Sequence, residues 1–121
     1  MSSPQWDRIT EFMKKFIERP LNNAFLNPIN PEVDNLPDYN DIVTNPMDLT
    51  TVKSKIENKQ YGDATQWYSD MCLIYENAIK YHGQKENTHW TDIAEFLLKE
   101  FKKTAKHFNV KDTSEWKAML T

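Results

Sequence analysis

The 121-residue sequence contains one cysteine and only two glycines. A single cysteine excludes any disulfide within the chain, which is typical of proteins in a reducing compartment. No apolar run approaches the roughly 20 residues that cross a bilayer, and the N-terminus lacks the apolar segment of a signal peptide. We therefore expect a soluble intracellular protein that does not associate with membranes.

Basic residues are absent from a long internal stretch. No Lys or Arg occurs between Arg19 and Lys53. Five acids fall within the same stretch, and they are Glu32, Asp34, Asp38, Asp41 and Asp48. The stretch is either a solvated acidic loop or the source of a local negative field that favours a basic partner.

Direct binding of nucleic acid is not expected from the charge. The formal net charge of −3 excludes a generic polyanion binder. Lysines gather near the C-terminus, but Glu95 and Glu100 interleave with them. A solvated helix face therefore explains these lysines better than a contact with DNA.

Aromatic and apolar residues are plentiful. Four Trp, five Tyr and six Phe can fill one small core. Apolar residues recur at spacings of three and four in four segments, which predicts amphipathic helices over about 3–19, 45–57, 64–81 and 90–108. We expect one all-α domain over 1–121, a helical bundle with its core at about 5–108. Residues 109–121 are a C-terminal extension that can form a short helix, with Trp116 as its anchor.

Local signals predict the ends of these helices. Asn45 and Pro46 are suited to the N-cap and first position of the second helix. Gly83 is suited to the position just after the third helix. Cys72 lies in the apolar stripe of that helix and is expected in the core. Continuing the stripe by four residues from Ala78 places His82 on its core-facing side.

Residues 20–45 are expected to form a long loop because they contain four prolines and many Asn and Asp residues. Long loops in compact domains usually have a function. This loop also carries apolar residues, including Phe25, Ile29 and Leu36, so it should pack against the bundle rather than extend into solvent.

Three motifs resemble the bromodomain family. They are LPDYNDIVTNPMDLTTVKSKI at 36–56, NAFLNPIN at 23–30 and ENAIKYHG at 76–83. The resemblance covers about residues 5–108. It implies a left-handed four-helix bundle with a long loop between the first and second helices. It also implies a pocket, between this loop and the short loop before the last helix, that reads acetylated lysine, most often in histone tails.

The resemblance assigns nine residues to the pocket. In the family the phenylalanine matched by Phe25 contacts the acetyl methyl group, and the tyrosine matched by Tyr39 holds the carbonyl through an ordered water. Asn77 matches an asparagine that braces the long loop. The full set is Phe25, Pro28, Ile29, Leu36, Tyr39, Ala78, Tyr81, His82 and Thr88.

The sequence departs from the family's pattern at the pocket. His82 stands where the family carries the asparagine that donates to the acetyl carbonyl. A neutral imidazole offers one donor and one acceptor. The usual Trp-Pro-Phe is Asn23-Ala24-Phe25 here, and Thr88 aligns with a position that is usually large and apolar. We expect a more open and more polar pocket.

These residues predict a protein-interaction module, a nuclear reader of acetylated histone or other acetylated peptides with weakened or altered affinity. Other chromatin proteins are further expected partners, and the chain is expected to be a monomer. The alternative is a scaffold that binds proteins without recognising acetyl-lysine. Catalysis is not expected, and neither is a cofactor or metal, because metal-ligand spacing, a Gly-rich phosphate loop and a nucleophile paired with a base are all absent.

Overall fold

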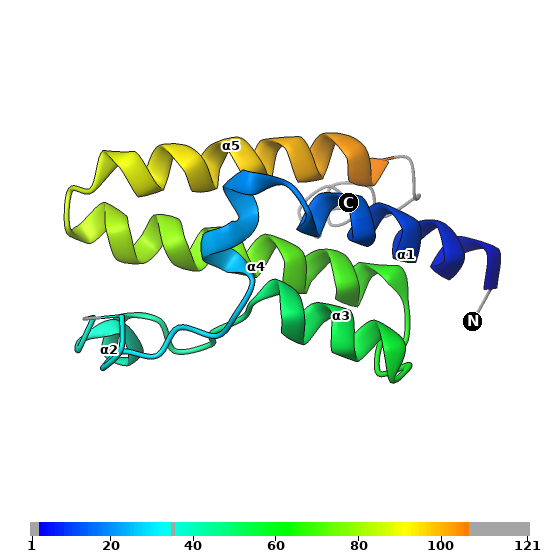
Figure 1. The fold of residues 1–121 in the computed structure, drawn as a ribbon, viewed down its shortest axis with the longest axis horizontal. Coiled ribbons are helices and arrows are strands. Elements are labelled where there is room, and N and C mark those ends of the chain that lie inside the picture. Colours follow the sequence, from blue (N-terminus) through cyan, green and yellow to red (C-terminus); the bar gives the residue numbers. More distant parts are fainter. Residues whose placement is uncertain (1–2, 35, 107–121) are drawn as a thin grey trace, which may run out of the picture.

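The computed structural model describes residues 3–34 and 36–106. The expected C-terminal helix and the anchor Trp116 therefore lie outside the described residues. Within them the chain forms helices and no strand, which confirms the predicted all-α class (Figure 1). The elements are α1 (Ser3–Ile17), the 3-10 helix η1 (Pro20–Phe25), α2 (Tyr39–Ile42), α3 (Leu49–Glu57), α4 (Ala64–Gln84) and α5 (Thr88–Ala105).

The four long helices form a bundle around α4 (Figure 1). Helices α4 and α5 run side by side and are joined by a short connection. Helices α1 and α3 pack at the other end of the bundle, and η1 leads from α1 toward α2. As a result, the long loop that carries α2 and the connection between α4 and α5 lie at the same end of the molecule.

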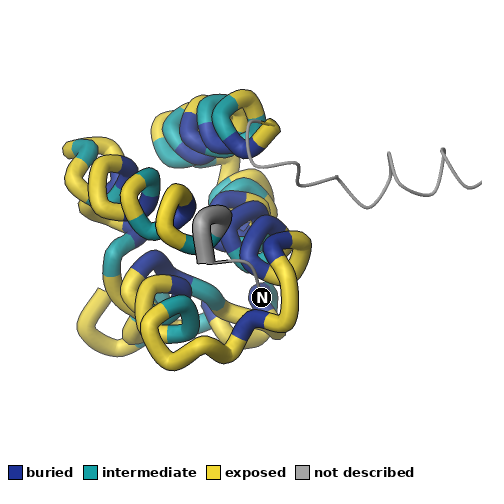
Figure 2. The backbone as a smooth tube through the Cα atoms, turned by 90° about the vertical axis from the view of Figure 1, so that its right-hand side faces the viewer, coloured by how far each residue is buried: buried dark blue, intermediate teal, exposed yellow. Residues whose placement is uncertain are grey.

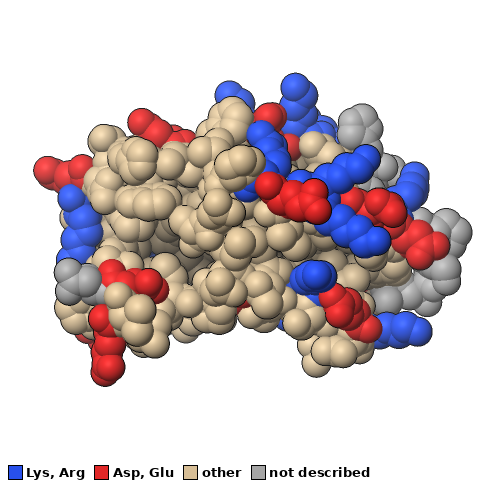
Figure 3. Space-filling model, viewed as in Figure 1, with Lys and Arg blue, Asp and Glu red and all other residues tan. Residues whose placement is uncertain are grey.

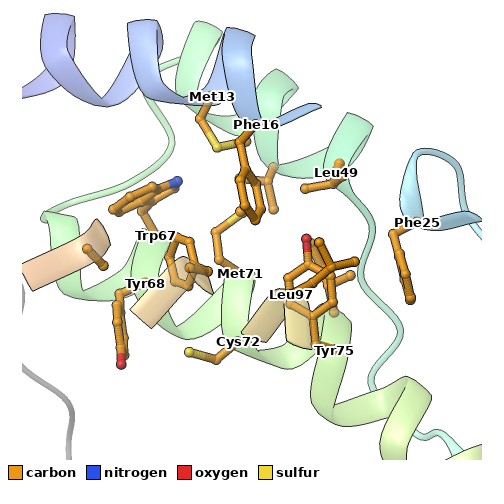
Figure 4. Close-up of a cluster of buried hydrophobic side chains, with 14 of the residues drawn as sticks. Met13, Phe16, Phe25, Leu49, Trp67, Tyr68, Met71, Cys72, Tyr75 and Leu97 are labelled. Carbon is orange, nitrogen blue, oxygen red and sulfur yellow. The ribbon is translucent and has the colours of Figure 1, made fainter. Parts of the chain in front are cut away.

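Helix α4 supplies more of the core than any other helix. Its buried residues include Trp67, Met71 and Tyr75, which meet Met13 and Phe16 from α1 and Leu97 from α5 (Figure 4). Cys72 is buried in this cluster, as predicted. Buried positions face inward along the helices and exposed positions face out (Figure 2), which is the pattern expected of amphipathic helices.

Helix α3 begins at Leu49, so the predicted N-cap at Asn45 is wrong. Asp48 caps the helix instead, and its carboxylate accepts from the Thr51 backbone N–H at 2.8 Å and from Thr51 Oγ1 at 2.7 Å. A carboxylate with two donors outcompetes the earlier asparagine. The Asn45 carbonyl instead accepts from Asn77 Nδ2 at 2.9 Å. Asn77 thus braces the long loop, as the resemblance implied.

Helix α4 continues through Gly83 to Gln84, so the predicted end at Gly83 is also wrong. Gly83 does not have a positive φ; Glu86 does, at 56°. The backbone N–H groups of Lys85 and Asn87 both donate to the His82 carbonyl, at 3.1 and 2.9 Å. These bonds close the last turn beyond the glycine and force Glu86 into the left-handed region.

The long loop is less irregular than predicted, because η1 and α2 form within it. Asn22 in η1 is fully buried. Its Nδ2 donates to the Phe16 carbonyl at 2.8 Å, and its Oδ1 accepts from the Tyr75 hydroxyl at 2.6 Å. This pair of bonds ties η1 to α1 and α4, and it places Phe25 against Tyr75 with ring centroids 5.1 Å apart.

Removing the Tyr75 hydroxyl leaves the buried Asn22 Oδ1 without its donor. We expect Tyr75→Phe to lower the free energy of unfolding by about 1–3 kcal/mol in urea denaturation. Tyr61→Phe is the matched control, because Asp70 Oδ2 accepts from both the Tyr61 hydroxyl and Lys55 Nζ, each at 2.7 Å. That carboxylate keeps a partner, so the control should lose about 0.5–1.5 kcal/mol. Equal losses would contradict the role assigned to Asn22.

Removing the glycine at position 83 and introducing one at position 86 should each stabilise the fold. A Cβ added at Gly83 meets nothing within 4 Å, so Gly83→Ala should raise the free energy of unfolding by about 0.5–1 kcal/mol. Glu86→Gly should add about 1 kcal/mol, because it relieves a left-handed conformation. Gly62→Ala is the control and should give no gain, since its Cβ would lie 3.2 Å from Gln66 Oε1. Thermal unfolding of the three variants tests this, and destabilisation by Glu86→Gly would refute it.

Candidate ligand-binding cavity

A cavity of about 670 Å³ opens where the long loop meets the end of α4 and the start of α5. This volume is in the range of small-molecule sites, about 300–1,000 Å³. The loop and η1 supply Phe25, Pro28, Ile29 and Leu36 as apolar walls. Figure 3 shows the hollow in the left half of the molecule, with acidic side chains over the loop below it.

All but one of the predicted site residues line this cavity. The exception is Thr88, which is the exposed first residue of α5. Trp90, in the first turn of α5, lines the cavity instead. Asn87 caps α5 by accepting from the Trp90 backbone N–H at 3.5 Å, so the first helical turn carries the indole round to the cavity. Matching Thr88 to the family's position by residue count alone does not take the direction of this helical turn into account.

Several residues outside the predicted site set also line the cavity. Ile74 and Met47 add apolar surface. The polar and charged additions are Asn23, Asn27, Asp34, Lys85 and Asn87. Asn23 and Asn27 could have been found as neighbours of Phe25 in the loop motif. Lys85 could not, because it follows the predicted end of the third helix and α4 extends further than predicted.

His82 presents a neutral imidazole to the cavity. Burial lowers its pKa from the ordinary value of 6.5. Its ring stacks on Trp90 with centroids 5.9 Å apart and stands perpendicular to Tyr81 at 5.2 Å. Neither ring nitrogen has a hydrogen-bond partner among the described residues. One N–H donor and one acceptor lone pair are therefore available to a ligand.

The Tyr39 hydroxyl is a second polar group in the cavity. Tyr39 is buried, and burial raises the pKa of its hydroxyl, which therefore stays protonated at neutral pH. No hydrogen-bond partner for this hydroxyl lies within the described part of the chain. The hydroxyl can donate to a ligand or to a bridging water.

Asp38 ties the loop to the end of α4. Lys85 Nζ pairs with one carboxylate oxygen, and the Tyr81 hydroxyl donates to the other at 2.6 Å. The hydrogen bond from Lys85 and, to a smaller extent, the one from Tyr81 hold the pKa of Asp38 below its usual range. The bond to Asp38 in turn raises the pKa of Tyr81 to about 12. The tie sets the distance between the two sides of the cavity.

The acids of the loop do not act as one field. Asp48 is a buried helix cap, with 4% of its surface exposed. Asp38 is paired with Lys85. Glu32, Asp34 and Asp41 remain exposed, and only Asp34 of these lines the cavity. The negative charge available at the mouth is therefore smaller than the sequence indicates.

Residues 3–34 and 36–106 contain neither a membrane-spanning helix nor a cluster of metal ligands. No helix there is long and apolar enough to span a membrane. No three His, Cys, Asp or Glu side chains in the same ranges lie close enough to hold a metal ion.

Comparison with known proteins places the chain in a family. The bromodomain family model matches residues 9–95. The sequence is 36% identical over 77 residues to transcription factor GTE1 of Arabidopsis thaliana, and 34% identical over 96 residues to transcription factor GTE6 of the same plant. These matches cover 64% and 77% of this chain, but only 19% and 26% of the two transcription factors.

Solved structures agree with the fold. The second bromodomain of Candida albicans Bdf1, bound to an imidazopyridine, superimposes with a TM-score of 0.77 and is 28% identical. The match covers 85% of this chain and 98% of that one. The bromodomain of human BAZ1A superimposes with a TM-score of 0.75 at 21% identity, over 86% of this chain and 97% of that one.

The burial of His82 predicts a pH-dependent stability. Because the folded-state pKa is lower than the unfolded value near 6.5, the unfolded chain binds the proton more readily. Stability from this group is complete above about pH 6.5 and is lost as the pH falls through the folded-state pKa. Urea unfolding between about pH 8 and 5 measures this loss. His82→Gln should flatten the dependence, whereas His89→Gln, a change at an exposed residue, should leave it. Equal slopes in wild type and His82→Gln would refute the assignment.

Proposed function

This chain belongs to the bromodomain family, and we propose that its cavity binds acetylated lysine with His82 as the polar anchor. Bromodomains are acetyl-lysine reader modules of chromatin and transcription proteins. The single observation that carries the proposal is the composition of the cavity. Apolar walls from Phe25, Pro28 and Ile29 face the neutral imidazole of His82.

The chemistry of acetylation explains why such a cavity suits the modified side chain. Acetylation removes the lysine charge, so the side chain can enter an apolar cavity at low cost. The acetyl carbonyl must still find a donor there. His82 can donate when the proton is on the nitrogen that faces the cavity, and Tyr39 can donate through a water.

The imidazole is expected to bind more weakly than the asparagine that the family carries. An amide presents its NH₂ donors in every state, whereas only one imidazole tautomer places a donor toward the carbonyl. The other tautomer presents a lone pair to the carbonyl oxygen and repels it. Binding therefore carries the cost of selecting one tautomer.

The acidic residues exposed on the long loop favour a basic peptide as the partner. Glu32, Asp34 and Asp41 are exposed on the loop, and they would favour lysines or arginines beside the acetylated residue. Histone tails have this character. The related transcription factors support a nuclear location and a role in transcription. The chain spans 19% and 26% of the length of these two relatives.

A direct test compares acetylated and unmodified versions of one histone-tail peptide by ¹H–¹⁵N NMR titration. We expect the acetylated peptide to shift resonances of Tyr39, Tyr81 and His82, and the unmodified peptide to leave them in place. His82→Asn should strengthen acetyl-lysine binding about ten- to hundredfold, since a hydrogen bond to a buried carbonyl contributes about 1–3 kcal/mol.

The matched control is His82→Leu, which keeps bulk but removes both nitrogens and should weaken binding further. Equal binding of both peptides by the wild-type chain would favour the alternative, a scaffold without acetyl-lysine recognition. Failure of His82→Asn to bind the acetylated peptide would also count against the proposal, because it restores the family's donor.

A further inference from the structure

Five aromatic rings form a continuous arc around the cavity. In spatial order they belong to Phe25, Trp90, His82, Tyr81 and Tyr39, and all five residues line the cavity. Successive ring centroids lie 6.5, 5.9, 5.2 and 5.2 Å apart. The ring plane of Phe25 makes an angle of 87° with that of Trp90, and the ring plane of His82 makes an angle of 89° with that of Tyr81. Because of these perpendicular pairs the five rings do not form one stack, and each of the five residues contributes to the lining of the same cavity.

The charges around this arc favour a cation. Asp34 and Lys85 are the charged residues that line the cavity. The Lys85 ammonium is paired with Asp38. Asp34 has no Lys or Arg partner among the described residues, and its Oδ2 accepts only from the Asn30 backbone N–H, at 2.9 Å. A negative charge is therefore left at the edge of a ring-lined cavity.

We propose that this cavity also binds trimethylated lysine, with the trimethylammonium group enclosed by the arc of Phe25, Trp90, His82, Tyr81 and Tyr39 near the Asp34 carboxylate. A cation within about 6 Å of an aromatic face is attracted by the ring quadrupole. The methyl groups bury apolar surface at the same time. This binding does not depend on acetyl-lysine recognition.

A trimethylammonium group does not require a hydrogen bond from the polar groups of the cavity. A trimethylammonium group has no N–H and no acceptor, so it leaves no hydrogen bond of its own unmade when buried. It therefore does not need the amide donor that His82 replaces. A neutral imidazole adds a further aromatic face without adding positive charge, and unmodified lysine is disfavoured because its ammonium would lose strong hydration.

The test uses one basic peptide in four forms, titrated into the ¹⁵N-labelled chain. The central lysine is trimethylated, acetylated, unmodified or replaced by its uncharged tert-butyl carbon analogue. We expect the trimethylated form to bind about tenfold more tightly than the unmodified form and the carbon analogue, with shifts at the Trp90 indole N–H. Equal binding of the trimethylated form and the carbon analogue would overturn the proposal, and so would binding no better than that of the unmodified form.

Substitutions in and near the cavity test where the trimethylammonium group binds. Trp90→Leu keeps an apolar side chain at this position but removes the ring, so trimethyl-lysine affinity should fall about fivefold or more. Phe96→Leu, at an exposed aromatic residue of the same helix that does not line the cavity, should have no effect. Asp34→Asn should weaken binding of the trimethylated peptide more than binding of the acetylated one, because only the trimethylated form places a cation inside the cavity. Asp41→Asn, at a residue that does not line the cavity, should weaken binding of the trimethylated peptide less.

The outcomes separate this proposal from acetyl-lysine reading. Loss of acetyl-lysine binding alone bears on the proposed function, and loss of trimethyl-lysine preference alone bears on this inference. Because Asp34 is an exposed surface residue, Asp34→Asn remains informative if Trp90→Leu fails to fold. An unchanged trimethyl-lysine affinity in Asp34→Asn would contradict the placement of the cation.

Discussion

The hydrogen bond from the Tyr75 hydroxyl to Asn22 joins the middle of α4 to η1, and the position of the cavity depends on it. Asn22 is fully buried and is also bound to the carbonyl of Phe16. Buried polar groups must keep their partners, so η1 has one place against α4. Phe25 ends η1 and packs on Tyr75. One buried pair in the core thereby fixes one wall of a cavity at the surface.

Two weaker ties hold the rest of the loop to α4. Asn77 donates to the Asn45 carbonyl at 2.9 Å, near the start of α3. Asp38 binds Tyr81 and Lys85 near the end of α4. These groups are more exposed than Asn22, so their net contribution to stability is smaller. Their effect is geometric, because they fix the position of the proline-rich segment relative to α4, which carries His82.

The sequence predicts the helices well because apolar spacing reports which faces are buried. It predicts the helix ends poorly, because several nearby groups compete for the same backbone donors and acceptors. Asn45 lost the N-cap of α3 to Asp48, and Gly83 became helical because the His82 carbonyl takes two N–H groups beyond it. The cavity followed the family's motifs wherever the match was continuous. The match does not extend to Thr88, which does not line the cavity. The path of the loop before α5 decides which side chain of its first turn points inward.

His82 couples the two ligands proposed for the cavity in opposite directions. The neutral ring offers an acetyl carbonyl only one donor and offers a trimethylammonium group an uncharged aromatic face. Protonation would supply a second N–H and with it a positive charge. The donor would favour acetyl-lysine, and the charge would repel trimethyl-lysine across a cavity in which Lys85 is already present and Asp38 is already paired. Burial lowers the pKa of His82 and so favours the neutral ring. The same desolvation would weaken the proposed acetyl-lysine reading and would keep the ring arc suitable for the proposed cation.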